Sequence, residues 1–460
     1  MKVLLVVYDN ESYVHHTPIG MAYLATALQN AGHDVEIYSQ DLYHWPESHL
    51  TEYLNKNPFD VIGLGIVAGY YPFRKMLKIS EAINKVPNKP FYIMGGHGPS
   101  PEPEYFLKKS GADCIVIGEG EITIVNLLDA LEHKRSLGNV KGIAYTESGR
   151  FIQTTPQPLI QDIDTIPIPD WRLFPMDYYA MYRVGNILNS TDRVGLVLSG
   201  RGCPFHCNFC YRMEAGSRIR SPENILEEVG KLQKDYNLNF FLFQDELLMT
   251  SVERTEKLCN AFKGKFRWGC NGRLNFATPS LMKLMKESGC EFINYGIEAV
   301  DDEALRNMNK ALTVKQIYSG IEATLAEGIH PGFNIIFGNI GETKKVLQKD
   351  VDFLLRYDEQ GQMRTIRPVT PYPGTPLYEY AVKNGMIKDA EDFYENKHTN
   401  QDLPCVNFTN LSEEEFRHAL CEANTTLLDN YFEKQKQRSK ETCEKLYLGN
   451  NTDFRGFRQT

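Results

Sequence analysis

Short apolar stretches alternate with amphipathic stretches in the first part of the chain. The amphipathic stretches have helical spacing, as in IGMAYLATALQNAG from Ile19, and each is predicted to cross from one apolar strand to the next. This alternation predicts a doubly wound parallel α/β sheet, Rossmann-like or flavodoxin-like, over residues 1–135, with ligands beyond the carboxyl ends of its strands. The predicted strands begin at Lys2 (KVLLVVY), Asp34 (DVEIYS), Asp60 (DVIGLGIV), Pro90 (PFYIMGG) and Asp113 (DCIVIG).

A long polar loop and two glycine turns stand at the predicted carboxyl edge of this sheet. The first strand is followed by DNESYVHHTPIG, from Asp9, and not by the G-x-G-x-x-G that a nicotinamide-binding domain requires there. The fourth and fifth strands are followed by GGHG (95–98) and GEGE (118–121). Such turns are common between strands and helices, and they equally suit a large, flat ligand that lies across the sheet edge.

A second alternation of apolar and amphipathic stretches occupies residues 191–383. Its predicted strands are too few for a closed eight-stranded barrel, so we expect an open, partial (β/α)6 barrel with functional loops at its carboxyl face. The segment 136–190 is rich in Pro and Asp, as in QDIDTIPIPDW, and is predicted to be a connector. Residues 384–460 are charged and are predicted to form a helical C-terminal region. The strands of the second run are predicted to begin at Arg193 (RVGLVLSG), Asn239 (NFFLFQD), Phe266 (FRWGCN), Glu291 (EFINYGIE), Gly332 (GFNIIFGN) and Met363 (MRTIRPVTPY).

The composition narrows the class of protein. The chain has 460 residues, of which 42% are hydrophobic and 24% charged, as in an ordinary globular protein of several domains. Its net charge of −9 gives no electrostatic reason to expect a nucleic acid partner. No uncharged run is long enough to span a bilayer, and no signal peptide pattern is present, so we expect a cytoplasmic protein. In that compartment the ten cysteines are expected to be metal ligands, catalytic groups or buried apolar residues rather than disulfides.

Three of these cysteines stand together in RGCPFHCNFCYR, residues 201–212. Cys203, Cys207 and Cys210 have the spacing C-x3-C-x2-C and follow the first strand of the second run. A structural zinc site closes with four ligands, and His206 could serve as the fourth in a Cys3His site. Three thiolates on a [4Fe–4S] cluster would instead leave one iron open for chemistry.

The cysteine motif, followed by an aromatic residue and placed after the first strand of a β/α run, resembles that of the radical S-adenosylmethionine (SAM) enzymes. The resemblance implies that the three cysteines bind a [4Fe–4S] cluster, that SAM chelates the fourth iron, and that reductive cleavage of SAM yields a 5′-deoxyadenosyl radical. FQDELLM, WGCNGR, YGIEAVDDEAL and FGNIGET, at four strand ends, resemble the SAM-binding elements of this family. The SAM-binding residues that the resemblance implies are Phe209, Tyr211, Asp245, Glu246, Arg273, Glu298 and Gly341.

Several of these segments also have an ordinary structural interpretation. Either Asp245 or Glu246 would meet the amino group of SAM, because an ammonium needs an acceptor, but an Asp here could instead cap a helix. Arg273 could hold the carboxylate of SAM or pair with a neighbouring acidic side chain. Gly341 could lie beside the adenine or turn the chain into a helix. Cys270 could face the barrel interior or be a small buried residue.

The two runs together resemble a narrower group, the cobalamin-dependent radical SAM enzymes, over about residues 1–385. The segment TPYPGTPLYEYA (370–381), the GEGE turn and the parallel domain ahead of the cysteines carry this resemblance, which implies that the first domain binds cobalamin. The cobalt-ligating motif D-x-H-x-x-G is absent, as is usual in this group, and Asp41 and His44 are its nearest approach. The alternative is that the first domain is vestigial and binds nothing. One of the two tyrosines Tyr70 and Tyr71 could equally pack against a helix. The implied cobalamin contacts are Pro18, Tyr70, Tyr71, Gly95, Gly96, Gly118, Glu119, Gly120 and Glu121.

The resemblance implies a methyltransferase that passes a methyl group from methylcobalamin to an unactivated carbon after the deoxyadenosyl radical abstracts hydrogen. One alternative is a non-methylating enzyme of the same group, such as an oxidative cyclase acting on a tetrapyrrole. Another, from a different class, is a non-catalytic zinc- or cluster-bearing module. The partners we expect are a small-molecule substrate, such as a natural product, a lipid or a tetrapyrrole, and an electron donor such as flavodoxin or ferredoxin. Neither a nucleic acid partner nor a membrane span is expected.

Overall fold

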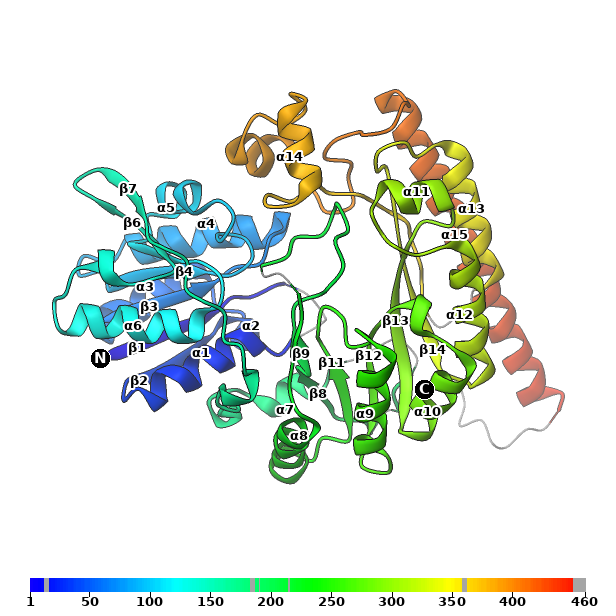
Figure 1. The fold of residues 1–460 in the computed structure, drawn as a ribbon, viewed down its shortest axis with the longest axis horizontal. Coiled ribbons are helices and arrows are strands. Elements are labelled where there is room, and N and C mark those ends of the chain that lie inside the picture. The colour runs from blue at the N-terminus through cyan, green and yellow to red at the C-terminus, as the bar shows by residue number, and fades with distance from the viewer. Residues whose placement is uncertain (12–15, 183–186, 190, 214–215, 358–361, 450–460) are drawn as a thin grey trace.

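The computed structural model contains two large sheets, built mainly of parallel strands, that stand side by side (Figure 1). The first sheet has the strand order β2-β1-β3-β4-β5-β6-β7, and the second has the order β15-β14-β13-β12-β11-β8. This confirms the predicted fold class, a doubly wound parallel sheet followed by a partial barrel and a helical C-terminal region. The structure describes residues 1–449 apart from 12–15, 183–186, 190, 214–215 and 358–361.

The first five strands of the first sheet are parallel, and their order, 2-1-3-4-5, is that of flavodoxin-like domains. The order of the strands reverses between β1 and β3, and the crevice beyond their carboxyl ends is where such sheets bind ligands. β6 and β7 extend the sheet as an antiparallel hairpin, although they lie in segment 136–190, which the sequence assigns to a connector. The strands are β1 (Lys2–Val7), β2 (Asp34–Ser39), β3 (Val61–Gly65), β4 (Phe91–Gly95), β5 (Cys114–Val116), β6 (Ile143–Glu147) and β7 (Arg150–Gln153).

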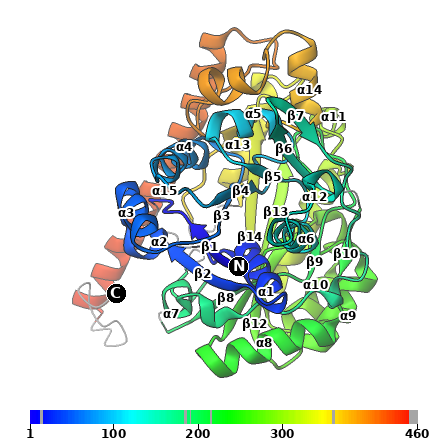
Figure 2. The same cartoon turned by 90° about the vertical axis from the view of Figure 1, so that its left-hand side faces the viewer.

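Alternate side chains of β1 enter two different hydrophobic cores, because successive residues of a strand point to opposite faces. Val3 and Leu5 pack with residues of α1 and α6, whereas Leu4 and Val6 pack with residues of α3, α4 and α5. Figure 2 shows these helices on the two sides of the strands. Burial on both faces explains why the strand is a continuous apolar run. The helices are α1 (Ile19–Asn30), α2 (Gln40–Tyr43), α3 (Glu47–Lys56), α4 (Tyr70–Asn84), α5 (Pro103–Ser110) and α6 (Gly120–Glu132).

The second sheet is parallel throughout and forms the predicted half-barrel. Its last strand, β15, is only two residues long. The register of β13 shifts between Gly296 and Glu298, and Glu298 has a left-handed φ of +68°. A separate two-stranded ribbon, β9 with β10, stands at the carboxyl face of this sheet. The strands are β8 (Val194–Val197), β9 (Gly200–Arg201), β10 (Arg218–Ile219), β11 (Phe240–Phe243), β12 (Arg267–Gly272), β13 (Cys290–Glu298), β14 (His330–Phe337) and β15 (Arg367–Pro368).

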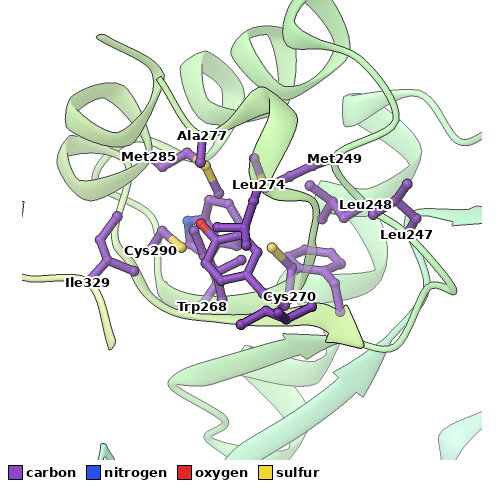
Figure 3. Close-up of a cluster of buried hydrophobic side chains, with 14 of the residues drawn as sticks. Leu247, Leu248, Met249, Trp268, Cys270, Leu274, Ala277, Met285, Cys290 and Ile329 are labelled. Carbon is purple, nitrogen blue, oxygen red and sulfur yellow. The ribbon is translucent and has the colours of Figure 1, made fainter. Parts of the chain in front are cut away.

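Helices cover the outer face of the second sheet and enclose a large hydrophobic core (Figure 3). Trp268 and Cys270 of β12 point into this core with Leu274, Met285 and Cys290, and none of these five side chains is more than 3% exposed. Cys270 is therefore a buried core residue, which agrees with the structural interpretation of that cysteine. The helices are α8 (Pro222–Tyr236), α9 (Val252–Phe262), α10 (Pro279–Glu287), α11 (Asp302–Asn307), α12 (Val314–Ala326) and α13 (Lys344–Arg356).

The C-terminal region packs on both halves of the molecule. Tyr378 and Phe393 join the core beneath α4 and α5, whereas Phe416 joins the core of the second sheet and stacks on Phe337 with 5.3 Å between ring centres. The long helix α15 lies alongside α13 (Figure 1). Across the described residues, no helix combines the length and apolar character needed to cross a membrane. The elements are α7 (Met176–Tyr179) in the connector, α14 (Pro376–Lys383), a π-helical turn (Asp392–Lys397) and α15 (Glu413–Tyr447).

Candidate functional site

The three cysteines lie in the loop between β9 and β10, at the carboxyl face of the second sheet. The loop begins at Gly202, whose φ is +78° and where a Cβ would lie 2.4 Å from the carbonyl oxygen of Gly216, so a side chain does not fit. Asn208 ties the loop down. Its backbone N–H donates to the carbonyl of Met308 at 2.9 Å, and its side-chain amide exchanges two hydrogen bonds with Asn339. The sequence therefore fixes the loop against the segments that follow α11 and β14.

The three thiols act on one another and face two cationic side chains. The pKa of Cys210 is raised to about 11, chiefly by burial and then by Cys207 and Cys203. Burial also raises the pKa of Cys203, while Arg273 and Lys310 act in the opposite direction and favour its thiolate. Neighbouring thiols flanked by positive charge fit an iron–sulfur cluster, which cysteine thiolates hold. No three His, Cys, Asp or Glu side chains in the described part of the chain converge as they would around a single metal ion.

Arg273 forms a buried wall of this loop. Its side chain is 5% exposed, and its guanidinium carbon lies 3.6 Å from the ring centre of Phe205. One terminal nitrogen donates to the main-chain oxygens of Lys310 and Ala311. Its Nε is buried without a hydrogen-bond partner, so it remains as a donor beside the cysteines.

Glu298 lies at the end of β13 and pairs with a lysine. Its Oε1 is 2.8 Å from Nζ of Lys310, and both side chains are 9% exposed. A Cβ on Gly296 would lie 2.4 Å from Oε1 of Glu298, so the glycine makes room for this pair. Nζ of Lys310 also stands 5.9 Å from the ring centre of Phe209, in the cysteine loop. The structure thus brings two of the predicted SAM residues, Glu298 and Phe209, together around one cation.

The structure separates Asp245 from Glu246, which the sequence left as alternatives. Asp245 is 1% exposed, and its carboxylate accepts from the backbone N–H and the hydroxyl of Ser199 and pairs with Arg254 at 3.4 Å. Glu246 is exposed, accepts from the backbone N–H of Gly202 at 3.0 Å and lines an interdomain cavity. The protein already occupies the carboxylate of Asp245, so Glu246 is the carboxylate that a ligand can reach.

Gly341 lies in a turn that a buried carboxyl group closes. Its φ is +81°, and Oε2 of the next residue, Glu342, accepts from the backbone N–H groups of Gly338 and Asn339 at 2.7 and 2.8 Å. Burial raises the pKa of Glu342 to about 8. This geometry gives Gly341 the turn-forming role that the sequence also allowed.

Tyr211 connects the cysteine loop to the rest of the site. Its ring stands edge-on to His97 of the GGHG turn, with 5.9 Å between ring centres. A Cβ on Gly374 would lie 2.6 Å from the Tyr211 ring, so the glycine of the TPYPGTP segment provides the space for it. The first domain, the cysteine loop and the segment after β15 therefore meet at one tyrosine.

A cavity of about 640 Å³ lies between the first sheet and the second. A Cβ on Gly63 would lie 2.7 Å from Cδ2 of Leu5, and one on Gly65 would lie 3.2 Å from Sδ of Met21, so glycines keep this space open. The opposite wall includes Gln244 and Glu246 from the loop after β11, together with Arg201. Its volume and largely apolar lining suit a sizeable ligand, as a cobalamin site requires. The predicted cobalamin contacts that line it are Pro18, Gly95, Gly96, Gly118, Glu119, Gly120 and Glu121.

Tyr70 and Tyr71 do not line this cavity. They form the first turn of α4. The ring of Tyr70 meets that of His398 edge-on, with 6.3 Å between ring centres. The guanidinium group of Arg74 lies over the ring of Tyr70. Burial raises the pKa of Tyr71, and Glu11 adds to this effect. The structure therefore places both tyrosines in α4, away from the lining of the cavity, with Tyr70 beside the C-terminal region.

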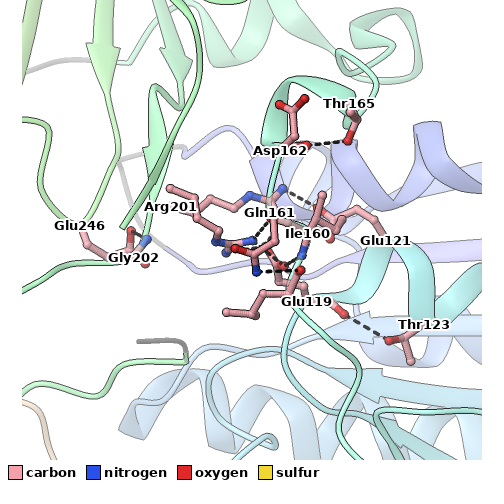
Figure 4. A network of polar contacts seen from close by, with 12 residues as sticks. Glu119, Glu121, Thr123, Ile160, Gln161, Asp162, Thr165, Arg201, Gly202 and Glu246 are labelled. Carbon is pink, nitrogen blue, oxygen red and sulfur yellow. Dashed lines mark hydrogen bonds and ion pairs between the residues drawn. The ribbon is translucent and has the colours of Figure 1, made fainter. Parts of the chain in front are cut away.

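Two of the predicted cobalamin contacts are held by arginines of the β9–β10 ribbon (Figure 4). Arg201 donates to Glu119 at 2.7 Å and to Glu121 at 2.5 Å. Arg218, its cross-strand partner, donates to both oxygens of Glu119 at 2.9 Å. Ile160 of the connector donates its N–H to Glu119 at 3.2 Å. The GEGE turn thus binds the base of the cysteine loop as well as lining the cavity.

A row of asparagines on the inner face of the half-barrel was missed by the sequence reasoning. Asn334 on β14 donates to Asn294 on β13 at 3.0 Å, Asn294 donates to Asn271 on β12 at 3.0 Å, and Asn271 donates to the carbonyl of Asp245 at 2.8 Å. Asparagine is unfavourable within strands, so its presence in three adjacent ones was the available signal. The row gives the interior of the half-barrel a band of hydrogen-bonded polar side chains that ends at the carbonyl of Asp245.

Comparison with known proteins agrees with this geometry. Residues 197–354 match the family described as Radical SAM superfamily, and residues 5–128 match the B12 binding domain. The chain is 31% identical to an uncharacterised methyltransferase of Pyrococcus horikoshii over 401 residues, which are 84% of each chain. It is 28% identical to the anaerobic magnesium-protoporphyrin IX monomethyl ester cyclase of Cereibacter sphaeroides, over 79% of this chain and 60% of that protein.

A solved structure has the same fold. It is that of the radical SAM methyltransferase TsrM from Kitasatospora setae with cobalamin and a [4Fe–4S] cluster bound. The TM-score is 0.74 at 17% identity, and the match covers 92% of this chain and 88% of that one. The order of the two domains and the helical C-terminal region are therefore shared across this fold.

Proposed function

Since the chain belongs to the cobalamin-dependent radical SAM enzymes, we propose that it is a C-methyltransferase. It would move a methyl group from cobalamin to an unactivated carbon of its substrate, after a SAM-derived radical has removed a hydrogen atom from that carbon. The family's cofactors are a [4Fe–4S] cluster, SAM and cobalamin.

The chain's own residues would hold these groups. The cluster with SAM supplies the radical that abstracts hydrogen, and cobalamin supplies the methyl group. Cys203, Cys207 and Cys210 would bind the cluster and leave its fourth iron to SAM. Glu246 would accept a hydrogen bond from the ammonium group of SAM, and Nε of Arg273 would donate to its carboxylate.

The observation that supports this proposal is the cavity between the two sheets. One wall is the glycine-lined edge of the first sheet, and the other includes Glu246 and Arg201, which flank the cysteine loop. A substrate at this interface would meet both the radical and the methyl donor without leaving the protein. Walls on both sides also limit the access of water, which protects reactive intermediates.

A second candidate is the oxidative cyclisation of a tetrapyrrole. The named activity of the Cereibacter sphaeroides relative favours it, at an identity close to that of the methyltransferase relative. In either case we propose a small-molecule substrate, such as a natural product, a lipid or a tetrapyrrole, and a cytoplasmic electron donor such as flavodoxin or ferredoxin.

The products made from SAM distinguish the two candidate functions, methyl transfer and oxidative cyclisation. The chain is purified without oxygen, reconstituted with iron, sulfide and hydroxocobalamin, and reduced with titanium(III) citrate in the presence of SAM. A methyltransferase forms S-adenosylhomocysteine, because each methyl group leaves SAM in this way, together with 5′-deoxyadenosine. 5′-Deoxyadenosine without S-adenosylhomocysteine would favour the cyclase. Absence of both, in an enzyme shown to contain the cluster, would contradict the proposed function.

A further inference from the structure

The asparagine row on the inner face of the half-barrel has a fixed hydrogen-bond direction. Nδ2 of Asn271 lies 2.8 Å from the carbonyl oxygen of Asp245, which can only accept, so this amide must present its NH2 group there. Its Oδ1 is then the atom that faces Asn294 at 3.0 Å, and Asn294 must donate to it. By the same step, Asn334 donates to Oδ1 of Asn294 at 3.0 Å. One backbone carbonyl therefore sets the orientation of all three amides.

The row ends at an amide oxygen that a ligand can reach. Oδ1 of Asn334 is the last acceptor of the row, and it forms no hydrogen bond with any residue that the structure describes. Asn334 is exposed, so this end of the row is open. Hydrogen bonds in a chain polarise one another, which strengthens a terminal acceptor. The NH2 group of Asn334 also keeps one hydrogen that the row does not use, so the end of the row offers both an acceptor and a donor.

Asn334 stands on the inner face of β14. Its neighbours Phe333 and Ile335 pack in the core that the outer helices cover, and alternate residues of a strand point to opposite faces. On the adjacent strand β13, Asn334 is opposite Gly296, and Ile335 is opposite Glu298. The exposed surface of Asn334 therefore lies inside the half-barrel, next to a strand position without a side chain and close to the level of a predicted SAM residue.

The two ends of the row lie next to the two candidate cofactor sites. Ile336 follows Asn334 by two residues, about 7 Å along the same face, and packs on the same small hydrophobic cluster as Phe209 of the cysteine loop. At the other end, the residues on either side of Asp245 both line the interdomain cavity. A molecule held along the row would thus lie between the cysteine loop and the cavity.

The chemistry of the row selects a neutral polar group. The three carboxamides carry no charge, and the ion pair at the end of β13, Glu298 with Lys310, is already closed at 2.8 Å. A carboxylate or an ammonium group would lose its hydration at the row without gaining a counter-charge. A carboxamide or a hydroxyl group can instead donate to Oδ1 of Asn334 and accept from its remaining N–H.

We propose that the asparagine row is a substrate-binding site, at which Asn334 holds a neutral group of the substrate that both donates and accepts hydrogen bonds, such as a carboxamide or a hydroxyl. The inference rests on the proposed function, in which a small-molecule substrate lies between the two cofactor sites. It adds the kind of polar group that this substrate carries and the residue that touches it.

The test compares three probes that share a ring and differ in the head group: cyclohexanecarboxamide, cyclohexanecarboxylate and cyclohexylammonium. Their Kd values are measured by saturation-transfer NMR on the full chain with its cluster reconstituted, in the presence of hydroxocobalamin and SAM and without a reductant. We expect the carboxamide to bind about fivefold more tightly than either charged probe. Asn334→Leu should remove this preference. Asn334→Asp should shift the preference to the ammonium probe, because a carboxylate then stands at the end of the row.

Asn139→Leu is the matched control, because Asn139 is also exposed but lies in a short helical turn of the first domain. It should leave all three Kd values within about twofold of wild type. Equal Kd values for the three probes, or a preference that survives Asn334→Leu, would overturn the inference. Should Asn334→Leu not fold by circular dichroism, Asn334→Asp decides, and an unchanged order of the Kd values would overturn it.

The same preparations separate this inference from the proposed function. Their iron content and the products that they form from SAM after reduction are measured in parallel with the Kd values. A wild-type chain that binds no cluster would contradict the proposed function. A wild-type chain that holds the cluster and forms the expected products from SAM, but does not prefer the carboxamide, would contradict this inference alone.

Discussion

Nη1 of Arg201 lies 2.7 Å from Oε1 of Glu119, and this contact joins the base of the cysteine loop to the first domain. Arg201 is followed closely by Cys203, whereas Glu119 is the N-cap of α6 and lines the interdomain cavity. The side chains of Arg201 and Glu119 are 14% and 7% exposed, so the pair is largely shielded from solvent. It therefore fixes the position of the candidate cluster site relative to the candidate cobalamin site.

Replacing Glu119 by Gln should loosen the contact between the two domains. The change removes one of the two carboxylates that Arg201 contacts and the carboxylate that Arg218 contacts, and removing one partner of a buried pair is costly. We expect the free energy of unfolding to fall by about 2–4 kcal/mol in urea titrations. The matched control is Glu81→Gln, because the exposed pair of Glu81 with Lys85 should contribute less than about 1 kcal/mol. Equal effects of the two substitutions would contradict the structural role of Glu119.

The three cysteines of the loop should be required together for the cluster. In the variant Cys203→Ser, Cys207→Ser, Cys210→Ser, the thiolates that would hold the cluster are gone. We expect the variant to lose bound iron and the broad visible absorbance of the reconstituted protein, and to make no 5′-deoxyadenosine from SAM. Cys421→Ser is the control, since Cys421 is exposed on α15, far along the chain from the loop. Iron retained by the triple variant would refute the assignment.

Substitution of Asp245 should mainly lower stability, whereas substitution of the adjacent Glu246 should mainly weaken the binding of SAM. Asp245→Asn disturbs a fully buried carboxylate that is bonded to Ser199 and Arg254, so we expect the free energy of unfolding to fall by about 2–4 kcal/mol. Glu246→Gln removes an exposed charge and should change stability by less than about 0.5 kcal/mol. Glu246→Gln should instead raise the Kd for SAM about tenfold, measured by isothermal titration calorimetry on the reconstituted enzyme. The reverse pattern would assign the SAM contact to Asp245.

The sequence predicts the architecture well because the parallel strands are buried on both faces. Apolar runs such as VLLVVY can be recognised as strands without any knowledge of tertiary contacts. The spacing of the three cysteines likewise indicates a cluster site from the local sequence alone. The β6–β7 hairpin, Ile143–Gln153, escaped prediction because its short strands lie at the end of the sheet, where alternation is weak.

Individual site residues were harder to predict, because pairing partners lie far apart in the chain. A carboxylate in a GEGE turn has the same local sequence whether it meets a ligand or an arginine. Only the fold shows that Glu119 meets Arg201 and Arg218. Asp41 was noted only for its failure to match a cobalt-binding motif. Only the fold shows that the hydroxyl of Tyr179, 138 residues away in the chain, donates to its carboxylate.

The buried carboxyl group of Glu342 should make stability depend on pH. Burial raises its pKa from 4.5 to about 8 in the folded protein, so between these values the folded state holds a proton that the unfolded state has released. The free energy of unfolding therefore decreases as the pH rises through this range, by a few kcal/mol at most, at about 1.4 kcal/mol per pKa unit. Glu342→Gln mimics the neutral acid, still accepts from the backbone N–H groups of Gly338 and Asn339, and cannot titrate. We expect the difference in stability between the variant and wild type to grow in favour of the variant from pH 6 to pH 8.5 in urea titrations. A difference that stays constant over this range would show that Glu342 is ionised throughout it and that the turn is closed by a carboxylate.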